Sequence, residues 1–143
     1  MAKLTPNFTL EEMCASSTAT ARHIDNTPTE SVKSNLRSLC ENVLQPLRDA
    51  YGKSIVINSG YRCKKLNSAV GGSKTSQHMT GEAADIRCNN KVTREWIFDY
   101  IKTHLTFDQL ILEHNSSGTY WVHVSYRKDG KNRKQVIADM LKK

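Results

Sequence analysis

Two histidines and one aspartate carry the side-chain chemistry of a divalent metal site. His78 stands near the end of a loop of small residues, and Asp85 follows it seven residues later in a short predicted strand. His123 stands on another predicted strand. Catalytic zinc takes three protein ligands, mostly histidine and carboxylate, and leaves a fourth position for water. We therefore predict that these residues bind Zn²⁺; the alternative is a loop cap, a turn cap and a histidine satisfied within the sheet.

The residues between the first two candidates favour a close approach to a ligand. Gly81, Ala83 and Ala84 have little or no side chain. The backbone between His78 and Asp85 therefore has room to turn back on itself at the glycine. We expect this turn to bring the imidazole and the carboxylate to the same ion.

The strand that carries His123 also predicts a general base. Side chains alternate along a strand, so Trp121 shares the face of His123. If Ile111 pairs with His123 in a hairpin, Glu113 faces Trp121 on that surface. Asp108 lies an odd number of residues from Glu113 and would face the other way. We predict Glu113 as the catalytic base, the alternative being a solvated carboxylate at the hairpin.

Four further residues are predicted to contact substrate. Arg62 follows a predicted strand and a glycine, so its guanidinium can reach over the cleft and hold a carboxylate or carbonyl oxygen by paired hydrogen bonds. Ser76 is expected to bond the substrate or the loop that carries His78. Tyr61 and Trp121 are expected to wall the site, and for these residues ordinary packing is the alternative.

The elements that must position these residues are readable from periodicity. Residues 1–26 form a polar arm with one short helix, in which Thr9 and Glu12 have capping-box spacing. A long helix begins at Thr27, which caps it, and ends at Gly52, with a kink at Pro46. Its apolar residues recur every three or four positions and predict one buried stripe: Val32, Leu36, Leu39, Val43 and Leu47.

Several short β-branched segments follow the long helix. One amphipathic helix, Thr93–Leu105, interrupts them and is expected to bury Trp96 and Ile97. The pattern predicts one α+β domain over 27–143, with helices packed on one face of a largely antiparallel sheet. The predicted strands are Ser54–Asn58, Ala83–Cys88, Phe107–Glu113, Tyr120–Tyr126 and Gln135–Met140.

Length and composition narrow the class of protein. The chain has 143 residues, and its 21 Lys and Arg against 14 Asp and Glu give a net charge of +7, which favours anionic partners. No apolar run is long enough to span a membrane, and no signal peptide begins the chain, so we expect synthesis in the cytoplasm. The spacing of its four cysteines favours free thiols, with a Cys63–Cys88 bridge as the alternative.

Three motifs in this order resemble a known family. They are Ser59-Gly60-Tyr61-Arg62, then Ser76-x-His78-x-x-Gly81-x-Ala83-x-Asp85, then Trp121-x-His123-Val124-Ser125. Together they resemble the zinc D-alanyl-D-alanine carboxypeptidases and their endolysin relatives, whose metal-binding scaffold the Hedgehog signalling domain shares. The resemblance covers about residues 28–138. It implies His78, Asp85 and His123 as zinc ligands and Arg62 as a substrate-binding residue.

The sequence departs from part of that family at Tyr120 and Trp121, where several relatives carry the catalytic carboxylate or a second histidine. Subgroups with a glutamate at the end of the preceding strand match Glu113 instead. If Glu113 is not the base, the alternative is a non-catalytic, zinc-stabilised module that binds cell-wall or virion partners.

The resemblance implies a zinc metallopeptidase that cleaves peptide bonds involving D-amino acids in peptidoglycan stem peptides, as a carboxypeptidase or an endolysin-type endopeptidase. We expect a monomer, encoded by a bacterium or a phage, that acts at the bacterial cell wall. Membrane insertion and nucleic-acid binding are not expected. The choice of bond is expected to depend on the loops at 64–75 and 115–119.

Overall fold

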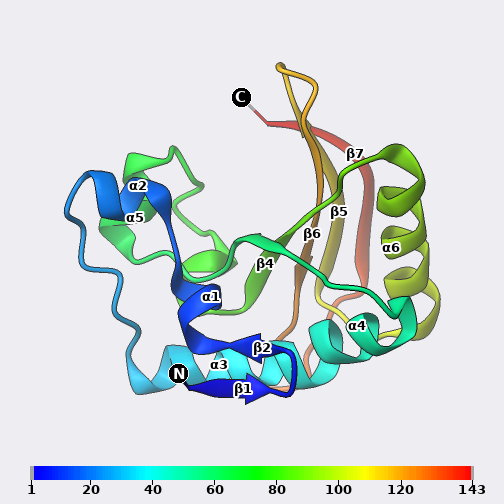
Figure 1. Ribbon diagram of the computed structural model, residues 1–143, viewed down its shortest axis with the longest axis horizontal. Helices are drawn as coiled ribbons and strands as arrows, with labels where there is room; N and C mark the ends of the chain where they lie inside the picture. The colour runs from blue at the N-terminus through cyan, green and yellow to red at the C-terminus, as the bar shows by residue number, and fades with distance from the viewer. Residues whose placement is uncertain (1, 143) are drawn as a thin grey trace.

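The β-branched segments of the chain pair into one five-stranded sheet in the computed structural model, which describes residues 2–142 (Figure 1). The order of its strands is β3-β4-β6-β5-β7, and a two-stranded hairpin of β1 and β2 lies apart from it. The strands are β1 (Lys3–Thr5), β2 (Phe8–Thr9), β3 (Ile57–Ser59), β4 (Ala83–Arg87), β5 (Gln109–Asn115), β6 (Tyr120–Ser125) and β7 (Gln135–Lys142).

The large sheet is mixed, with one parallel pair at its edge. β5 and β6 form the predicted hairpin, and β4 pairs antiparallel with the other side of β6. β7 runs parallel to β5, because β6 ends at the level where β5 begins and β7 starts from that same level on the other side of β5. The predicted α+β domain with a largely antiparallel sheet is confirmed.

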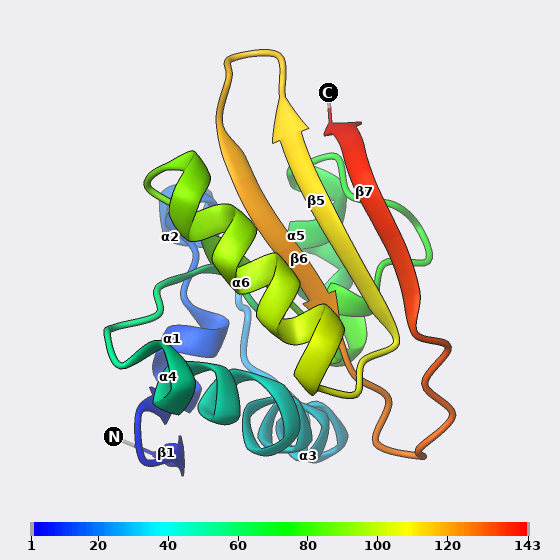
Figure 2. The same ribbon diagram turned by 90° about the vertical axis from the view of Figure 1, so that its right-hand side faces the viewer.

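Helices cover both sides of this sheet. Figure 2 shows α6 crossing one face over β5 and β6, while α5 lies behind the sheet. The described helices are α1 (Leu10–Cys14), α2 (Ser17–Ala21), α3 (Glu30–Leu39), the π-helix η1 (Cys40–Leu44), α4 (Gln45–Tyr51), α5 (Lys64–Ala69), the 3-10 helix η2 (Gln77–Thr80) and α6 (Lys91–His104). The long helix α6 packs on one face of the sheet, as predicted for the helices, whereas the short helix α5 lies on the other side.

The first long helix begins two residues later than predicted. Thr29 is its cap, because its side chain accepts a hydrogen bond from the backbone N–H of Val32. The predicted cap, Thr27, instead donates its backbone N–H and its hydroxyl to Asp25. The predicted apolar stripe is confirmed, since all five of its residues are buried: Val32, Leu36, Leu39, Val43 and Leu47.

The helix continues past Leu39 through the π turn η1 before α4 begins. Pro46 lies in the first turn of α4, directly after η1. Because proline has no N–H to continue an α-helical ladder, the wider turn lies where the ladder is interrupted. The helix ends at Gly52, which has a φ of +74°, as predicted.

The N-terminal segment contributes side chains to the core of the domain. The predicted capping box of Thr9 and Glu12 is confirmed, and it begins α1. Phe8 and Met13, on either side of this cap, are fully buried in the same cluster as the helix stripe. The expected N-terminal arm is therefore held by the hydrophobic effect and contributes to the main core.

One predicted strand and one predicted helix differ from the structure in extent or in burial. In place of the strand predicted over Ser54–Asn58, the structure has the shorter β3, Ile57–Ser59. β3 lies at the edge of the sheet and pairs only with β4, and Val56, directly before it, is 43% exposed. In α6, Ile97 is buried as predicted, but Trp96 is 39% exposed and packs against the ring of Tyr51. The stripe of α6 that faces the core is therefore narrower than predicted.

The cysteines are free thiols, as predicted, and no Cys63–Cys88 bridge forms. Burial raises the pKa of the Cys40 thiol to about 12. Over residues 2–142, no helix is both long enough and apolar enough to cross a membrane.

A buried carboxylate joins three segments beside the start of β5. Asp108 is fully buried, and Arg133 donates to it from Nε, from Nη2 and from the backbone N–H at 2.7–3.0 Å. The side-chain amide of Gln77 donates to the same carboxylate at 2.9 Å. These bonds compensate the cost of burying the charge, and they connect η2 and the β6–β7 connection to β5.

This carboxylate makes the stability of the fold sensitive to acid. The hydrogen bonds from Arg133 are the main cause that lowers the pKa of Asp108 from 3.8 to about 2. A lowered pKa in the folded state stabilises the protein above the unfolded pKa, and that stabilisation is lost as pH falls through the folded pKa. The free energy of unfolding should therefore fall between about pH 4 and about pH 2.

Guanidinium unfolding curves measured across that range in wild type and Asp108→Asn check this expectation. The variant should be less stable at neutral pH and should show a shallower pH dependence. Equal slopes for the two proteins would contradict it.

Candidate metal centre

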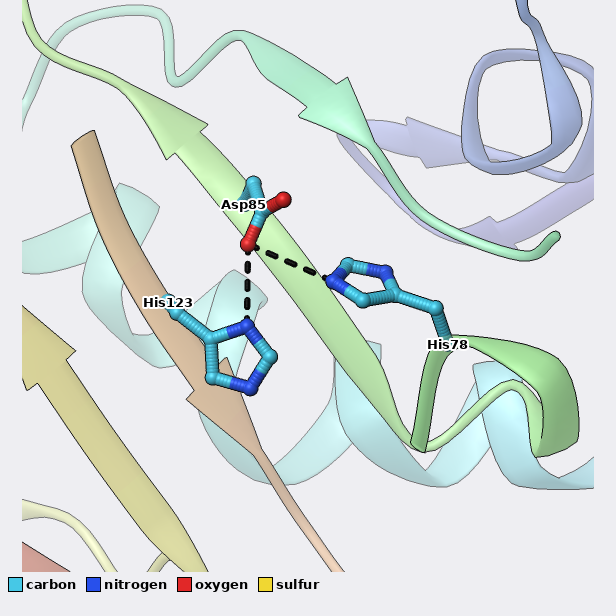
Figure 3. A group of neighbouring side chains, drawn as sticks. All are labelled: His78, Asp85 and His123. Atoms are coloured by element: carbon cyan, nitrogen blue, oxygen red, sulfur yellow. Dashed lines mark hydrogen bonds and ion pairs between the residues drawn. The ribbon is translucent and has the colours of Figure 1, made fainter. Parts of the chain in front are cut away.

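His78, Asp85 and His123 converge at one point on the sheet face opposite α6. Each residue offers one donor atom, and these atoms all lie within 4.8 Å of one another. Figure 3 shows both imidazoles directed at the same carboxylate oxygen, Oδ1 of Asp85. The distance to this oxygen is 3.3 Å from Nε2 of His78 and 2.9 Å from Nδ1 of His123. The three predicted ligands are therefore brought together.

The sheet register places two of the three residues. Asp85 and His123 are direct partners across the antiparallel pair of β4 and β6. Side chains opposite each other on one face of such a pair lie about 4.5–5.5 Å apart at their Cβ atoms. Their neighbours Ala84 and Val124, also partners, point into the core on the other face. Alternation thus separates the polar site from the apolar core.

The third residue is positioned by hydrogen bonds to its loop. The backbone N–H of His78 donates to the hydroxyl of Ser76, which caps η2. The ring atom Nδ1 lies 2.7 Å from the carbonyl oxygen of Gly60. A carbonyl can only accept, so Nδ1 donates its proton to Gly60, and Nε2 is the ring nitrogen that faces Asp85. The imidazole is therefore held with Nε2 directed at the candidate metal position, and this nitrogen binds a metal once its proton is lost.

The return of the chain after His78 depends on a glycine. Gly81 ends η2 with a φ of +78°, in the left-handed region. A Cβ atom at this position would lie 2.8 Å from the carbonyl oxygen of Val32 and 2.9 Å from its Cγ1. The predicted turn at Gly81 is confirmed, and α3 packs too closely against it to admit a side chain.

The electrostatics of the group favour an ionised Asp85. Burial alone would raise the pKa of this carboxyl. The charge of His78 and hydrogen bonds from both imidazoles outweigh burial and hold that pKa well below its ordinary value. The carboxylate is therefore available as a ligand at neutral pH.

The donor set fits zinc. Donor atoms about 2.0–2.1 Å from a tetrahedral zinc ion lie roughly 3.3 Å apart. The separations of 3.3 Å and 2.9 Å between the imidazole nitrogens and the Asp85 oxygen are close to that value. Two imidazoles and one carboxylate also match the ligand types of open zinc sites, which leave one position for water.

The predicted register of the hairpin is confirmed. Ile111 pairs with His123, and Glu113 pairs with Trp121. Trp121 donates its indole N–H to Oε1 of Glu113 at 2.9 Å, and the same oxygen lies 3.7 Å from Nδ1 of His123. Glu113 is only 2% exposed. A buried carboxylate, oriented by the indole, thus stands beside the candidate metal ligands.

Arg62 lines the same cleft with part of its hydrogen-bonding capacity unused. Its Nη2 donates to the hydroxyl of Ser76 at 3.4 Å, and its buried Nε makes no hydrogen bond within the described chain. Burial lowers the pKa of the guanidinium, and the charges of Asp85 and Glu113 oppose this shift. The group stays positively charged beside two carboxylates.

A cleft of about 760 Å³ opens over the candidate metal centre. Both loops expected to select the bond contribute to it, with Gly71 and Ser73 from one and Asn115 and Ser117 from the other. The half-buried ring of Trp121 also lines it.

Tyr61, which was predicted to wall the site, packs in the hydrophobic core. Its side chain is 7% exposed and belongs to the hydrophobic core, and it is absent from the described residues that line the cleft. Its backbone N–H donates to Met13, which holds this segment against α1. The alternative of ordinary packing is the one that the structure supports.

Three polar residues of the cleft were missed by the sequence analysis. Gln77, Gln109 and Arg133 also line the cleft. Gln77 and Arg133 meet only through Asp108, across 31 and 25 residues of chain. Alternation along β5 could have identified Gln109, which shares the face of Ile111 and Glu113, but no local pattern links Gln77 and Arg133 through Asp108.

Comparison with known proteins agrees with this geometry. A family model described as Peptidase M15 matches residues 6–125. The chain belongs to the peptidase M15 family. The predicted resemblance is therefore confirmed. Membership in a peptidase family and the His–Asp–His group agree with the predicted class of protein, a zinc-dependent metallopeptidase.

One relative is a zinc D-Ala-D-Ala carboxypeptidase of Streptomyces albus G. The chain is 50% identical to it over 44 residues. These residues are 30% of this chain, and the match spans only 17% of the length of that relative.

Substitution of Gly81, the glycine after η2, tests whether its close packing against α3 is needed to position His78. Gly81→Ala places a Cβ against Val32 in a strained backbone conformation, so it should destabilise the fold by about 1–3 kcal/mol and weaken Zn²⁺ binding. Thermal unfolding and zinc titration would measure the two effects. Gly118→Ala is the matched control, because it also has a positive φ but nothing within 4 Å of its Cβ position. Equal losses in both variants would show that contact with α3 is unimportant.

Proposed function

We propose that this chain is a zinc-dependent metallopeptidase that hydrolyses peptide bonds involving D-amino acids in bacterial peptidoglycan stem peptides. The observation that carries the proposal is a buried carboxylate, Glu113, placed beside a three-donor group in an open cleft. His78, Asp85 and His123 are the proposed zinc ligands. Membership in the M15 family and the name of the relative from Streptomyces albus G support the substrate class.

In this proposal the metal and Glu113 have separate tasks. Bound zinc lowers the pKa of a water ligand toward ~7 and polarises the scissile carbonyl. Glu113 accepts the proton of the attacking water and transfers it to the leaving amine. Its Oε1 is held by the indole of Trp121, so the carboxylate is oriented before substrate binds. Trp121 therefore acts as a positioning residue as well as a wall of the cleft.

Arg62 is the proposed substrate-binding cation. Its guanidinium lines the cleft, and its charge is available to a carbonyl or carboxylate oxygen of the peptide. Ser76 holds Nη2 of Arg62 and caps the turn that carries His78, so one hydroxyl orients both a ligand and the substrate clamp. We also propose that the chain acts at the bacterial cell wall and that it is a monomer.

Replacing the base separates hydrolysis from metal binding. Glu113→Gln keeps the size of the side chain but cannot accept a proton, so turnover should fall by about 100-fold or more while zinc content is retained. Hydrolysis of a synthetic stem peptide and metal analysis of the same sample would measure both. Retention of full activity would rule out Glu113 as the base.

Glu82→Gln is the matched control, since Glu82 is a carboxylate three residues from Asp85 that lies outside the cleft and bonds Thr80. It should leave turnover unchanged. If wild type binds zinc but hydrolyses nothing, the chain is the non-catalytic zinc module.

Digestion of purified muropeptides, followed by mass spectrometry, tests the substrate. The zinc-loaded protein should cleave stem peptides, chelation should abolish cleavage, and added Zn²⁺ should restore it. Release of D-Ala alone identifies a carboxypeptidase, and cleavage after L-Ala identifies an endopeptidase. Cleavage that persists in the chelator-treated protein would contradict the metal-dependent mechanism.

A further inference from the structure

Arg133 occupies the cleft without a role in the proposed chemistry. It lies in the connection between β6 and β7, and its side chain is 54% exposed. Arg62 and Arg133 are the two Arg or Lys residues among the described residues that line the cleft. The carboxylates of Asp85 and Glu113 line the same space. In the proposed enzyme the zinc ion offsets the charge of its ligand Asp85, and Arg62 and Arg133 are the side chains of the cleft that attract a peptide carboxylate.

Arg133 is held in a fixed orientation. Oδ1 of the buried Asp108 accepts from its Nε, and Oδ2 accepts from its Nη2. The backbone N–H of Arg133 also donates to Oδ1. This pairing uses one edge of the guanidinium plane, and no hydrogen bond within the described chain uses Nη1. An arginine held in this way offers its remaining donors to a ligand with little loss of side-chain entropy.

The position of Arg133 along the cleft follows from β5. The cleft floor includes alternate residues of this strand: Gln109, Ile111, Glu113 and Asn115. Ile111 is the partner of His123 and so marks the level of the metal ligands. Asp108, which holds Arg133, directly precedes Gln109 at one end of this row. At about 3.3 Å per residue, that end lies roughly 7 Å, or two residues of an extended peptide, from the level of Ile111.

We propose that Arg133 is a specificity-determining residue, an inference that rests on the proposed function. Arg133 binds a carboxylate of the substrate about two residues from the bond that is cut. A stem peptide offers two such groups, the free carboxylate of D-glutamate and the C-terminal carboxylate. Both present the planar oxygen pair that a guanidinium recognises. Asp108 acts through Arg133 as a positioning residue.

The test compares three synthetic stem pentapeptides of the sequence L-Ala, D-Glu, L-Lys, D-Ala, D-Ala. The first has both carboxylates free, the second has the D-glutamate carboxylate amidated, and the third has the C-terminus amidated. Binding is measured by calorimetry with the full chain carrying Glu113→Gln, which prevents cleavage. Arg133→Gln is then added to this background, and Lys131→Gln removes an exposed charge from the same connection as the matched control.

Arg133→Gln should weaken binding of the peptide with both carboxylates about ten-fold. It should not affect the peptide whose recognised carboxylate is already amidated, and this arm identifies which carboxylate is bound. Lys131→Gln should change none of the three affinities. Equal weakening of all three peptides, or no weakening, would overturn the proposal, because a merely structural arginine does not distinguish a carboxylate from an amide.

Loss of Arg133 leaves Asp108 buried without its cation, so Arg133→Gln alone can unfold the chain. The double variant Asp108→Asn with Arg133→Gln removes both charges and should show the same loss of discrimination in a folded protein. Cleavage by wild type without any preference among the three peptides overturns the role of Arg133 alone. Failure of wild type to cleave any stem peptide, with the Arg133-dependent preference in binding intact, overturns the proposed function instead.

Discussion

The antiparallel pairing of β4 with β6 is the interaction on which the site depends. It places Asp85 directly opposite His123 on one face and Ala84 opposite Val124 on the other. A slip of one residue in this register would turn the carboxylate into the core and a core side chain into the cleft. The hydrophobic contacts of the opposite face stabilise the register, so the core that folds the chain also aligns the candidate metal ligands.

A second constraint is that three buried side chains near the cleft are each held by a hydrogen bond from another segment. His78 bonds the carbonyl of Gly60, Glu113 accepts from Trp121, and Asp108 accepts from Arg133 and Gln77. An unpaired buried charge would destabilise the fold, so these bonds are required for stability. The same bonds orient the imidazole, the proposed base and the proposed specificity residue. Stability and preorganisation of the site therefore have one physical origin.

Most of the site could be predicted because its residues lie in short, strongly patterned segments. Alternation along a strand showed which neighbours share a face with His123, and the assumed pairing of Ile111 with His123 is the one that the structure has. The turn at Gly81 was predictable because a glycine between a candidate ligand and a strand is typical of a left-handed turn. The capping box of Thr9 and Glu12 and the buried stripe of α3 are equally local signals.

The sequence by itself thus determined the three donor residues, the face on which they lie, and the α+β order of the elements, because side-chain type and periodicity act over a few residues. Only the tertiary structure decided that Tyr61 packs into the core, that Thr29 and not Thr27 caps the first long helix, and that β7 runs parallel to β5. It also decided that Arg133 enters the cleft, through a carboxylate 25 residues away. These outcomes depend on which distant segments meet when the core closes, and no local pattern encodes that choice.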